Sequence, residues 1–206
     1  MVEPVVRGLS DLERYDCRES GLDALGVVRD MQPDLILLDL YLPDIDGFVL
    51  APQLKAAAKG ARVLLLTVRA DDVALYHANS PCFSGMLWKS VEITRELPLA
   101  IQTVLAGGRY FAADVRTSLR RLRSDPQAFF KILSPKEIAL LPSLGLGWED
   151  AEVARVCRLS VHTVRSHRQH ILGKLGMHRS IELVHWCIQH GFVPPPRGIG
   201  WVREDA

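Results

Sequence analysis

The stretch of sequence that decides the fold is PDLILLDLYLPDIDG, residues 33–47. It contains four consecutive apolar residues at 35–38, and Asp39 follows them directly. A short apolar run of this length is typical of a strand that is buried on both faces of a parallel sheet. The segments around it have the spacing of apolar residues that predicts helices. We expect these helices at 22–31, 48–58, 71–78 and 91–106.

Two further apolar runs follow the same pattern. The run at 63–66 ends at Thr67, and the weaker run at 86–88 ends at Lys89. Strands that alternate with helices predict a parallel sheet with helices on both faces. Because the carboxyl ends of such strands meet at one edge of the sheet, we expect Asp39, Thr67 and Lys89 to lie close together there.

Composition and charge divide the chain into two parts. The 206 residues are 48% hydrophobic and 24% charged, which excludes wholesale disorder. The net charge of +1 hides an uneven distribution, because residues 1–130 carry 15 Lys and Arg against 17 Asp and Glu, whereas residues 131–206 carry 10 against 7. The second part also holds six of the seven histidines. Because the second half is basic, the small whole-chain charge does not argue against a nucleic-acid partner.

The sequence carries no signal for membrane insertion or export. No apolar run approaches the roughly 18 residues of a membrane span, and the N-terminus lacks a charged segment followed by an apolar one. The four cysteines form no C-x-x-C pair. We therefore expect ordinary packing cysteines, a reducing cytoplasmic location and no membrane partner.

From Leu133 onward the periodicity is helical throughout. Ser134 and Pro135 form a strong start signal, because serine caps a helix and proline is favoured at its first position. Ser160 is the expected cap of a later, longer helix. We assign residues 1–108 to a first domain, 109–131 to a linker with a basic helix, 132–193 to a helical domain, and 194–206 to a proline-rich tail.

The helical domain has the features of a helix-turn-helix, whose second helix enters the major groove of DNA. Between Val153 and Ile181 the chain has six Lys and Arg and no acid, and phosphate binding requires such a uniform charge. A solvated helix face without a partner is the alternative. The motif favours DNA, because the segment from Leu133 to about Leu183 resembles the LuxR-type helix-turn-helix without a gap. The matching positions are LSPKE at 133–137, Gly147, Glu152-Val153-Ala154, Ser160, Thr163-Val164, His167, Ile171-Leu172 and Lys174-Leu175.

This resemblance implies four helices, the third of which contacts DNA, and a double-stranded promoter site as the partner. Base contacts are implied for Arg165, Ser166 and Gln169. Arginine suits the O6 and N7 atoms of guanine, and glutamine suits adenine. Phosphate contacts are implied for Thr163, His167, Arg168 and Lys174, with packing as the alternative role of His167. The fourth helix commonly forms a dimer contact in this family, which implies a homodimer through Leu183 and Val184.

Two positions depart from the LuxR-type pattern. Pro142 lies inside the first helix of the domain, where it removes a hydrogen bond and should kink the helix. Arg158 occupies a turn where the family usually has glycine. That turn is therefore strained, or Arg158 is an additional phosphate contact.

The front half resembles a response-regulator receiver, on the strength of residues 33–47 with Thr67 and Lys89 at the following strand ends. The resemblance implies a flavodoxin-like α/β fold in which Asp39 accepts a phosphoryl group from a sensor histidine kinase. Thr67 would then bond a phosphoryl oxygen and Lys89 would neutralise charge, as a carboxylate nucleophile requires. It also implies Mg²⁺ held by acids, for which only Glu3 and Asp39 are candidates.

The receiver resemblance is incomplete at the N-terminus. Residues 3–9 resemble the first receiver helix, so the first strand is missing, and the second strand is shortened to about 15–19. Without the first strand, 34–39 would expose a long hydrophobic edge. Three resolutions are open: the true start lies upstream, the edge pairs with another chain, or the tail at 199–202 fills the gap. Two further positions depart from the receiver pattern. Met86 stands where the family usually has an aromatic switch residue, and Val68 stands where it usually has a small residue.

The predicted chain is thus a receiver-like α/β domain followed by an all-α LuxR-type domain, as in the NarL/FixJ type of transcription regulator. The receiver would control dimerisation or access to DNA by phosphorylation. The alternative is a phosphorylation-independent regulator in which Asp39 is vestigial and a ligand or protein partner supplies the input. A phosphatase using Asp39 is disfavoured because Tyr41 stands where such enzymes often place a second acid. An adaptor protein with a vestigial helix-turn-helix is also disfavoured, because the basic and polar face around Arg165 is intact.

Overall fold

The computed structural model describes residues 3–9, 12–68, 71–90 and 92–193. The chain divides into two compact units, with the main division between Leu122 and Arg123. The first unit contains the sheet, and the second is helical. No helix in these described ranges is long and apolar enough to cross a membrane.

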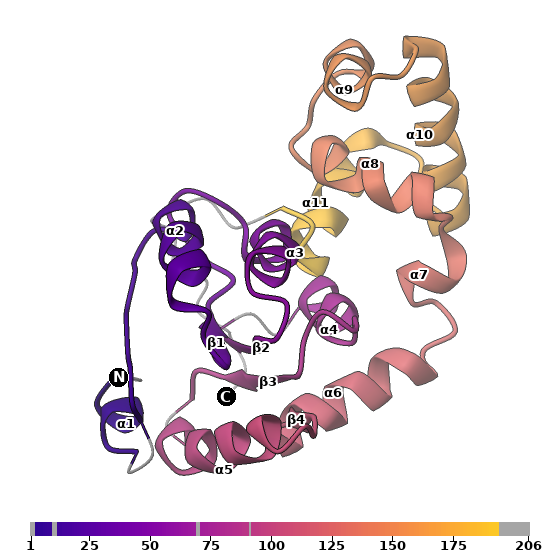
Figure 1. The fold of residues 1–206 in the computed structure, drawn as a ribbon. Coiled ribbons are helices and arrows are strands. Elements are labelled where there is room, and N and C mark those ends of the chain that lie inside the picture. The colour runs from indigo at the N-terminus through magenta and orange to yellow at the C-terminus, as the bar shows by residue number, and fades with distance from the viewer. Residues whose placement is uncertain (1–2, 10–11, 69–70, 91, 194–206) are drawn as a thin grey trace. The chain divides into compact units, whose positions relative to one another are not determined.

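The first unit is built on a parallel sheet of four strands in the order β1-β2-β3-β4 (Figure 1). The strands are β1 (Leu35–Leu38), β2 (Arg62–Thr67), β3 (Gly85–Trp88) and β4 (Tyr110–Phe111). The three predicted strands are confirmed. The sequence did not predict β4, which pairs with β3 and lies within the range assigned to the linker. The sheet therefore continues past residue 108.

Helices cover both faces of this sheet, as expected for a parallel α/β fold (Figure 1). They are α1 (Glu3–Arg7), α2 (Gly21–Met31), α3 (Gly47–Ala57), α4 (Asp72–Ala78) and α5 (Ile93–Leu105), followed by α6 (Ala113–Ser124). On one face, α1 and α5 bury Val6 and Leu97 against Leu64, Leu66 and Leu87 of the sheet. The predicted helices are confirmed, and the core of the unit lies between these layers.

The region before α2 differs from the sequence prediction. Residues 12–19 form no strand, so the shortened second strand predicted at 15–19 is wrong. Leu12 and Tyr15 instead pack their side chains against the core cluster under α1 and α5. In the part of the chain that the structure describes, β1 pairs only with β2. A strand needs a neighbour for its backbone hydrogen bonds, and residues 15–19 have none beside them.

Within the described residues α1 begins at Glu3, and β1 is the first strand along the chain. β1 is consequently an edge strand within the described ranges, and three of its four residues are only half-buried. The tail at 199–202, which we considered as a replacement strand, lies outside the described residues. The other two resolutions of this edge stay predictions.

The second unit contains the predicted four helices and one short additional helix. The elements are α7 (Phe129–Ile132), α8 (Pro135–Gly145), α9 (Asp150–Cys157), α10 (Val161–Leu175) and α11 (Ser180–His190). Ser134 caps α8 as predicted, and it forms a capping box with Glu137. Pro142 is exposed and α8 continues past it to Gly145, so the proline does not end the helix. Buried Leu141, Val164 and Leu183 belong to the core of this unit.

Candidate DNA-binding surface and receiver site

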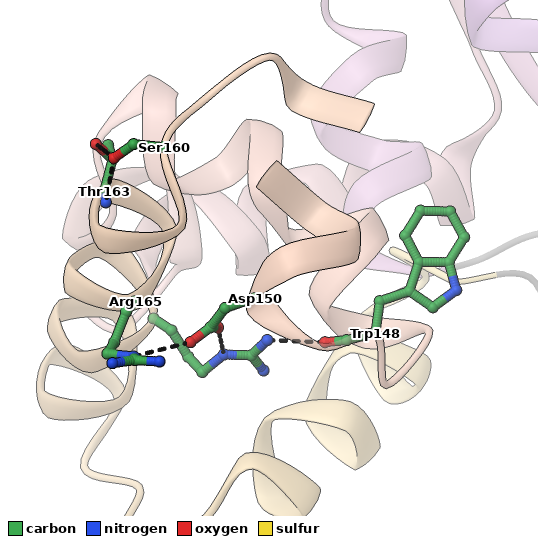
Figure 2. A network of polar contacts seen from close by, with 6 residues as sticks. Trp148, Asp150, Ser160, Thr163 and Arg165 are labelled. Atoms are coloured by element: carbon green, nitrogen blue, oxygen red, sulfur yellow. Dashed lines mark hydrogen bonds and ion pairs between the residues drawn. The ribbon is translucent and has the colours of Figure 1, made fainter. Parts of the chain in front are cut away.

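The turn between α9 and α10 fixes the start of α10. Arg158 has a φ of 54°, in the left-handed region that glycine adopts most readily, so the predicted strain in this turn is present. Ser160 then caps α10: its Oγ accepts a hydrogen bond of 3.0 Å from the backbone N–H of Thr163. The two hydroxyl groups of Ser160 and Thr163 also lie 2.7 Å apart (Figure 2). The first turn of α10 is therefore ordered by its own side chains.

The two sides of α10 differ in burial. Val164 and Ile171 have no exposed surface, which anchors one side in the core. Of the three residues predicted to face bases, Arg165 and Gln169 are exposed and Ser166 is half-buried. Residues at i, i+1 and i+4 share one side of a helix, so these three form one polar surface. His167 and Thr163 are half-buried at its margins.

A carboxylate from α9 holds two arginines of α10 (Figure 2). Asp150 Oδ2 accepts a hydrogen bond of 3.3 Å from Nε of Arg165, and Oδ1 accepts one of 2.8 Å from Nε of Arg168. The Nη2 group of Arg168 also donates to the carbonyl oxygen of Trp148 at 2.8 Å. The side chain of Arg168 is only 13% exposed, whereas that of Arg165 is 65% exposed. Arg168 thus connects α10 to the start of α9, and Arg165 points to solvent.

Lys174 also has a partner within the domain. Its Nζ donates to Oε2 of Glu137 at 2.7 Å, and the Glu137 side chain is only 4% exposed. The same carboxylate accepts hydrogen bonds from the backbone and hydroxyl of Ser134. Burial raises the pKa of Glu137, but the bonds from Lys174 and Ser134 together outweigh it and hold that pKa below its ordinary value. The ion pair therefore fastens α10 to the start of α8.

The predicted dimer contact is half wrong. Leu183 has no exposed surface and lies in the core of its own protomer, so it cannot contact a second copy. Val184 is half-buried. The exposed side of α11 carries Ile181, His185 and Gln189 instead. The helical period explains this, because Leu183 and Cys187 are four residues apart and both point inward.

At the end of β1, the structure brings Asp39 and Lys89 together as predicted. Lys89 Nζ donates to Asp39 Oδ2 at 2.5 Å, and both side chains are about a third exposed or less. Asp39 Oδ1 also accepts a hydrogen bond from the backbone N–H of Tyr41 at 3.1 Å. Thr67 ends β2 beside them, and its carbonyl oxygen accepts from the N–H of Lys89, but its side chain is buried.

The loop after Asp39 is held at two helix starts. At the start of α2, Asp44 accepts hydrogen bonds from the N–H groups of Gly21 and Leu22 and from the hydroxyl of Ser20, the N-cap residue. The backbone hydrogen bonds from Leu22 and Gly21 lower the pKa of Asp44 to about 2. Gly47 starts α3, where a Cβ atom would lie 2.7 Å from the carbonyl oxygen of Asp39.

The residues present do not fit the Mg²⁺ site that a receiver implies. Glu3, one of the two candidate ligands, accepts a hydrogen bond of 3.0 Å from Nε of Arg7 within α1. Asp39, the other, is paired with Lys89. Across the residues that the structure describes, no group of three or more His, Cys, Asp or Glu side chains could hold a metal ion. A hard divalent cation needs several oxygen ligands, so the predicted pair of Glu3 and Asp39 is not a metal site here.

Comparison with known proteins gives two family matches. Residues 6–101 match the model of the response regulator receiver domain, and residues 131–187 match that of bacterial regulatory proteins of the luxR family. The oxygen regulatory protein NreC of Staphylococcus aureus is 30% identical over 192 residues, covering 87% of each chain.

Solved structures of RcsB have the same fold. RcsB of Salmonella enterica serovar Typhimurium, bound to the promoter P1flhDC, matches with a TM-score of 0.58 and 19% identity, covering 90% of this chain and 89% of that one. A structure of two RcsB dimers bound to two parallel DNAs matches with a TM-score of 0.60 and 20% identity over the same shares.

Proposed function

Because the chain belongs to the response regulators that join a receiver domain to a LuxR-type DNA-binding domain, we propose that it binds a promoter site through α10. Members of this family are transcription regulators and not enzymes. One observation carries the proposal: exposed Arg165 and Gln169, with Ser166 between them, lie on α10 away from buried Val164 and Ile171. A helix with such a side can enter the major groove and bond base edges.

We assign different roles to the other polar residues of α10. Thr163 and His167 flank the base-contacting side and are available to bond phosphates. Arg168 and Lys174 each have a carboxylate partner within the domain, so we assign them to its stability. The predicted number of cationic phosphate contacts from α10 falls accordingly, and the salt dependence of binding should fall with it, because contacts by Lys and Arg release the counterions.

Arg165 provides the test of this assignment. A duplex selected from a randomised library by the full chain is compared with single-base variants by fluorescence anisotropy. Arg165→Ala should lose about 1–3 kcal/mol of discrimination at one base position. Arg155→Ala removes the same charge from an exposed site on α9 and should weaken all duplexes alike. Unchanged base preference in Arg165→Ala would show that α10 is oriented differently.

A homodimer on DNA is part of the same proposal. A two-fold symmetric pair places two α10 helices about one turn of DNA apart, which predicts a palindromic site with half-sites about 10 base pairs apart. Exposed Ile181 and half-buried Val184 are two apolar residues that α11 offers to a second copy. A promoter partner also implies a cytoplasmic location.

The site around Asp39 favours the phosphorylation-independent alternative for the input. Asp39 and Lys89 are paired as a phosphoacceptor site requires, but the residues described around them supply no metal ligand set. We therefore infer that a protein partner or ligand acts on the receiver, and not a sensor histidine kinase. The full chain is incubated with Mg²⁺ and a small phosphodonor, and its intact mass is measured. Absence of an adduct supports this inference, whereas an adduct that Asp39→Asn abolishes would restore the phosphoacceptor role.

A further inference from the structure

Asp150 lies at the first position of α9, yet both of its carboxylate oxygens bond arginines of α10. Electrostatic attraction alone would disfavour a carboxylate here, because a negative charge beside a DNA-binding surface weakens the attraction for phosphates. We propose that Asp150 is a positioning residue that orients Arg165 for base contact (Figure 2). The inference rests on the proposed function, because it assumes that Arg165 meets DNA.

The atoms involved determine which edge of Arg165 is presented. Asp150 bonds Arg165 through Nε, on the side edge of the guanidinium. In the described part of the chain, the two terminal nitrogens of Arg165 make no hydrogen bond. Those two nitrogens are the pair that can bond O6 and N7 of a guanine in a bidentate manner. Contact with Asp150 therefore leaves the edge that is needed for guanine free.

Arg168 fixes the position of Asp150. Its guanidinium bonds Asp150 through Nε and the carbonyl oxygen of Trp148 through Nη2, each at 2.8 Å. With 13% of its side chain exposed, Arg168 has little freedom to move. The carboxylate is thus held by α9 and by one arginine of α10, and it restrains the other arginine. A restrained side chain loses less conformational entropy when it binds a base than a free one does.

The effect of charge and the effect of positioning have opposite signs, which makes the proposal testable. Removal of one negative charge near the DNA-binding side should strengthen binding to every duplex. Glu149→Gln makes this change one residue away and leaves in place the hydrogen bond of 3.0 Å from the backbone N–H of residue 149 to Oε2 of Glu152. Asp150→Asn removes the same charge, but it also weakens the hold on Arg165. The two variants have the same net charge. If Asp150 positions Arg165, only Asp150→Asn should change the base preference.

The experiment measures anisotropy of the full chain on the selected duplex, on its single-base variants and on an unrelated duplex. Glu149→Gln should keep the ratio of selected to variant affinity. Asp150→Asn should lower that ratio roughly fivefold, as expected for an exposed arginine that loses an ion-pair partner. The loss should fall at the base position that Arg165→Ala identifies, and Asp150→Asn should cause no further loss in the Arg165→Ala background.

Thermal unfolding shows whether each variant is folded. If Asp150→Asn does not fold, Asp150→Glu keeps the charge while moving the carboxylate by one methylene, and the same loss of preference is expected. An unchanged or raised ratio in the folded variant would overturn the positioning role. Loss of preference in Arg165→Ala without any loss in Asp150→Asn would overturn this inference alone. No effect of Arg165→Ala on base preference would instead contradict the orientation of α10 given in the proposed function.

Discussion

Replacement of Lys174 by methionine should destabilise the helical unit by about 2 kcal/mol. The Glu137 side chain is 4% exposed and accepts three hydrogen bonds, one of them from Lys174. Removing one partner of a fully buried ion pair costs about 3–5 kcal/mol. Here Lys174 is 41% exposed, and water can replace part of the lost interaction. The two bonds from Ser134 also remain, so the lower value, close to that of one charged hydrogen bond, is expected.

The assay is urea unfolding of the full chain, monitored by helical circular dichroism. Lys136→Met is the matched control, since Lys136 is an exposed lysine of α8, and its free energy of unfolding should change by less than about 0.5 kcal/mol. The effect of Lys174→Met should depend on pH. Because the folded pKa of Glu137 lies below its ordinary value of 4.5, the stabilisation is complete above that pH and is lost as pH falls through the folded pKa.

The difference between wild type and Lys174→Met should therefore shrink in acid, where Glu137 is neutral in both. An equal difference at neutral pH and in acid would refute the ion-pair explanation. The ion-pair explanation would also be refuted if Lys174→Met were as stable as wild type at neutral pH but bound all DNA sequences more weakly. Lys174 would then be a phosphate contact. The folded variant should keep its base preference.

Three further predictions concern single positions. Arg158→Gly should relieve the left-handed strain and raise the free energy of unfolding by about 0.5–1 kcal/mol, whereas a flatter salt dependence of DNA binding would identify Arg158 as a phosphate contact. Leu183→Ala should lower the unfolding free energy by about 2–5 kcal/mol, because Leu183 is buried. Ile181→Asp should change the unfolding free energy by less than about 0.5 kcal/mol and should reduce dimer formation in sedimentation. The reverse pattern would refute the assignment of the buried and exposed sides of α11. Gly47→Ala should lower the melting temperature of the first unit, because its Cβ would meet the carbonyl oxygen of Asp39, and an unchanged melting temperature would show that this loop yields.

The strand ends were predictable because they depend on local patterns. Apolar runs that end in Asp39, Thr67 and Lys89 specify strands of one parallel sheet, and the topology then brings their ends together. β4 was not predicted, because a strand of two residues is too short to show an alternation of apolar and polar residues. The strand at 15–19 was wrong because the sequence supplied its composition but not the neighbouring strand that it needs.

The roles of side chains within the helical unit were less predictable. Leu183 was assigned from family resemblance, although its spacing of four from Cys187 signals a shared buried side. The contacts of Arg168 with Asp150 and of Lys174 with Glu137 span 18 and 37 residues. Such contacts depend on how helices cross, and no pattern in the sequence specifies that. A charged residue next to a binding helix can therefore look like a ligand contact when it is part of the scaffold.

The loop after Asp39 has a mechanical consequence for any input. Its Asp44 is bonded to the first turn of α2, and its Asp46 accepts a hydrogen bond of 2.7 Å from Phe48 at the start of α3. The loop is short and is hydrogen-bonded at the starts of both helices, which restrains it. With a pKa of about 2, Asp44 stays charged and bonded at any pH near neutrality. We therefore expect a movement at Asp39 to reach the N-terminal ends of α2 and α3 through these hydrogen bonds.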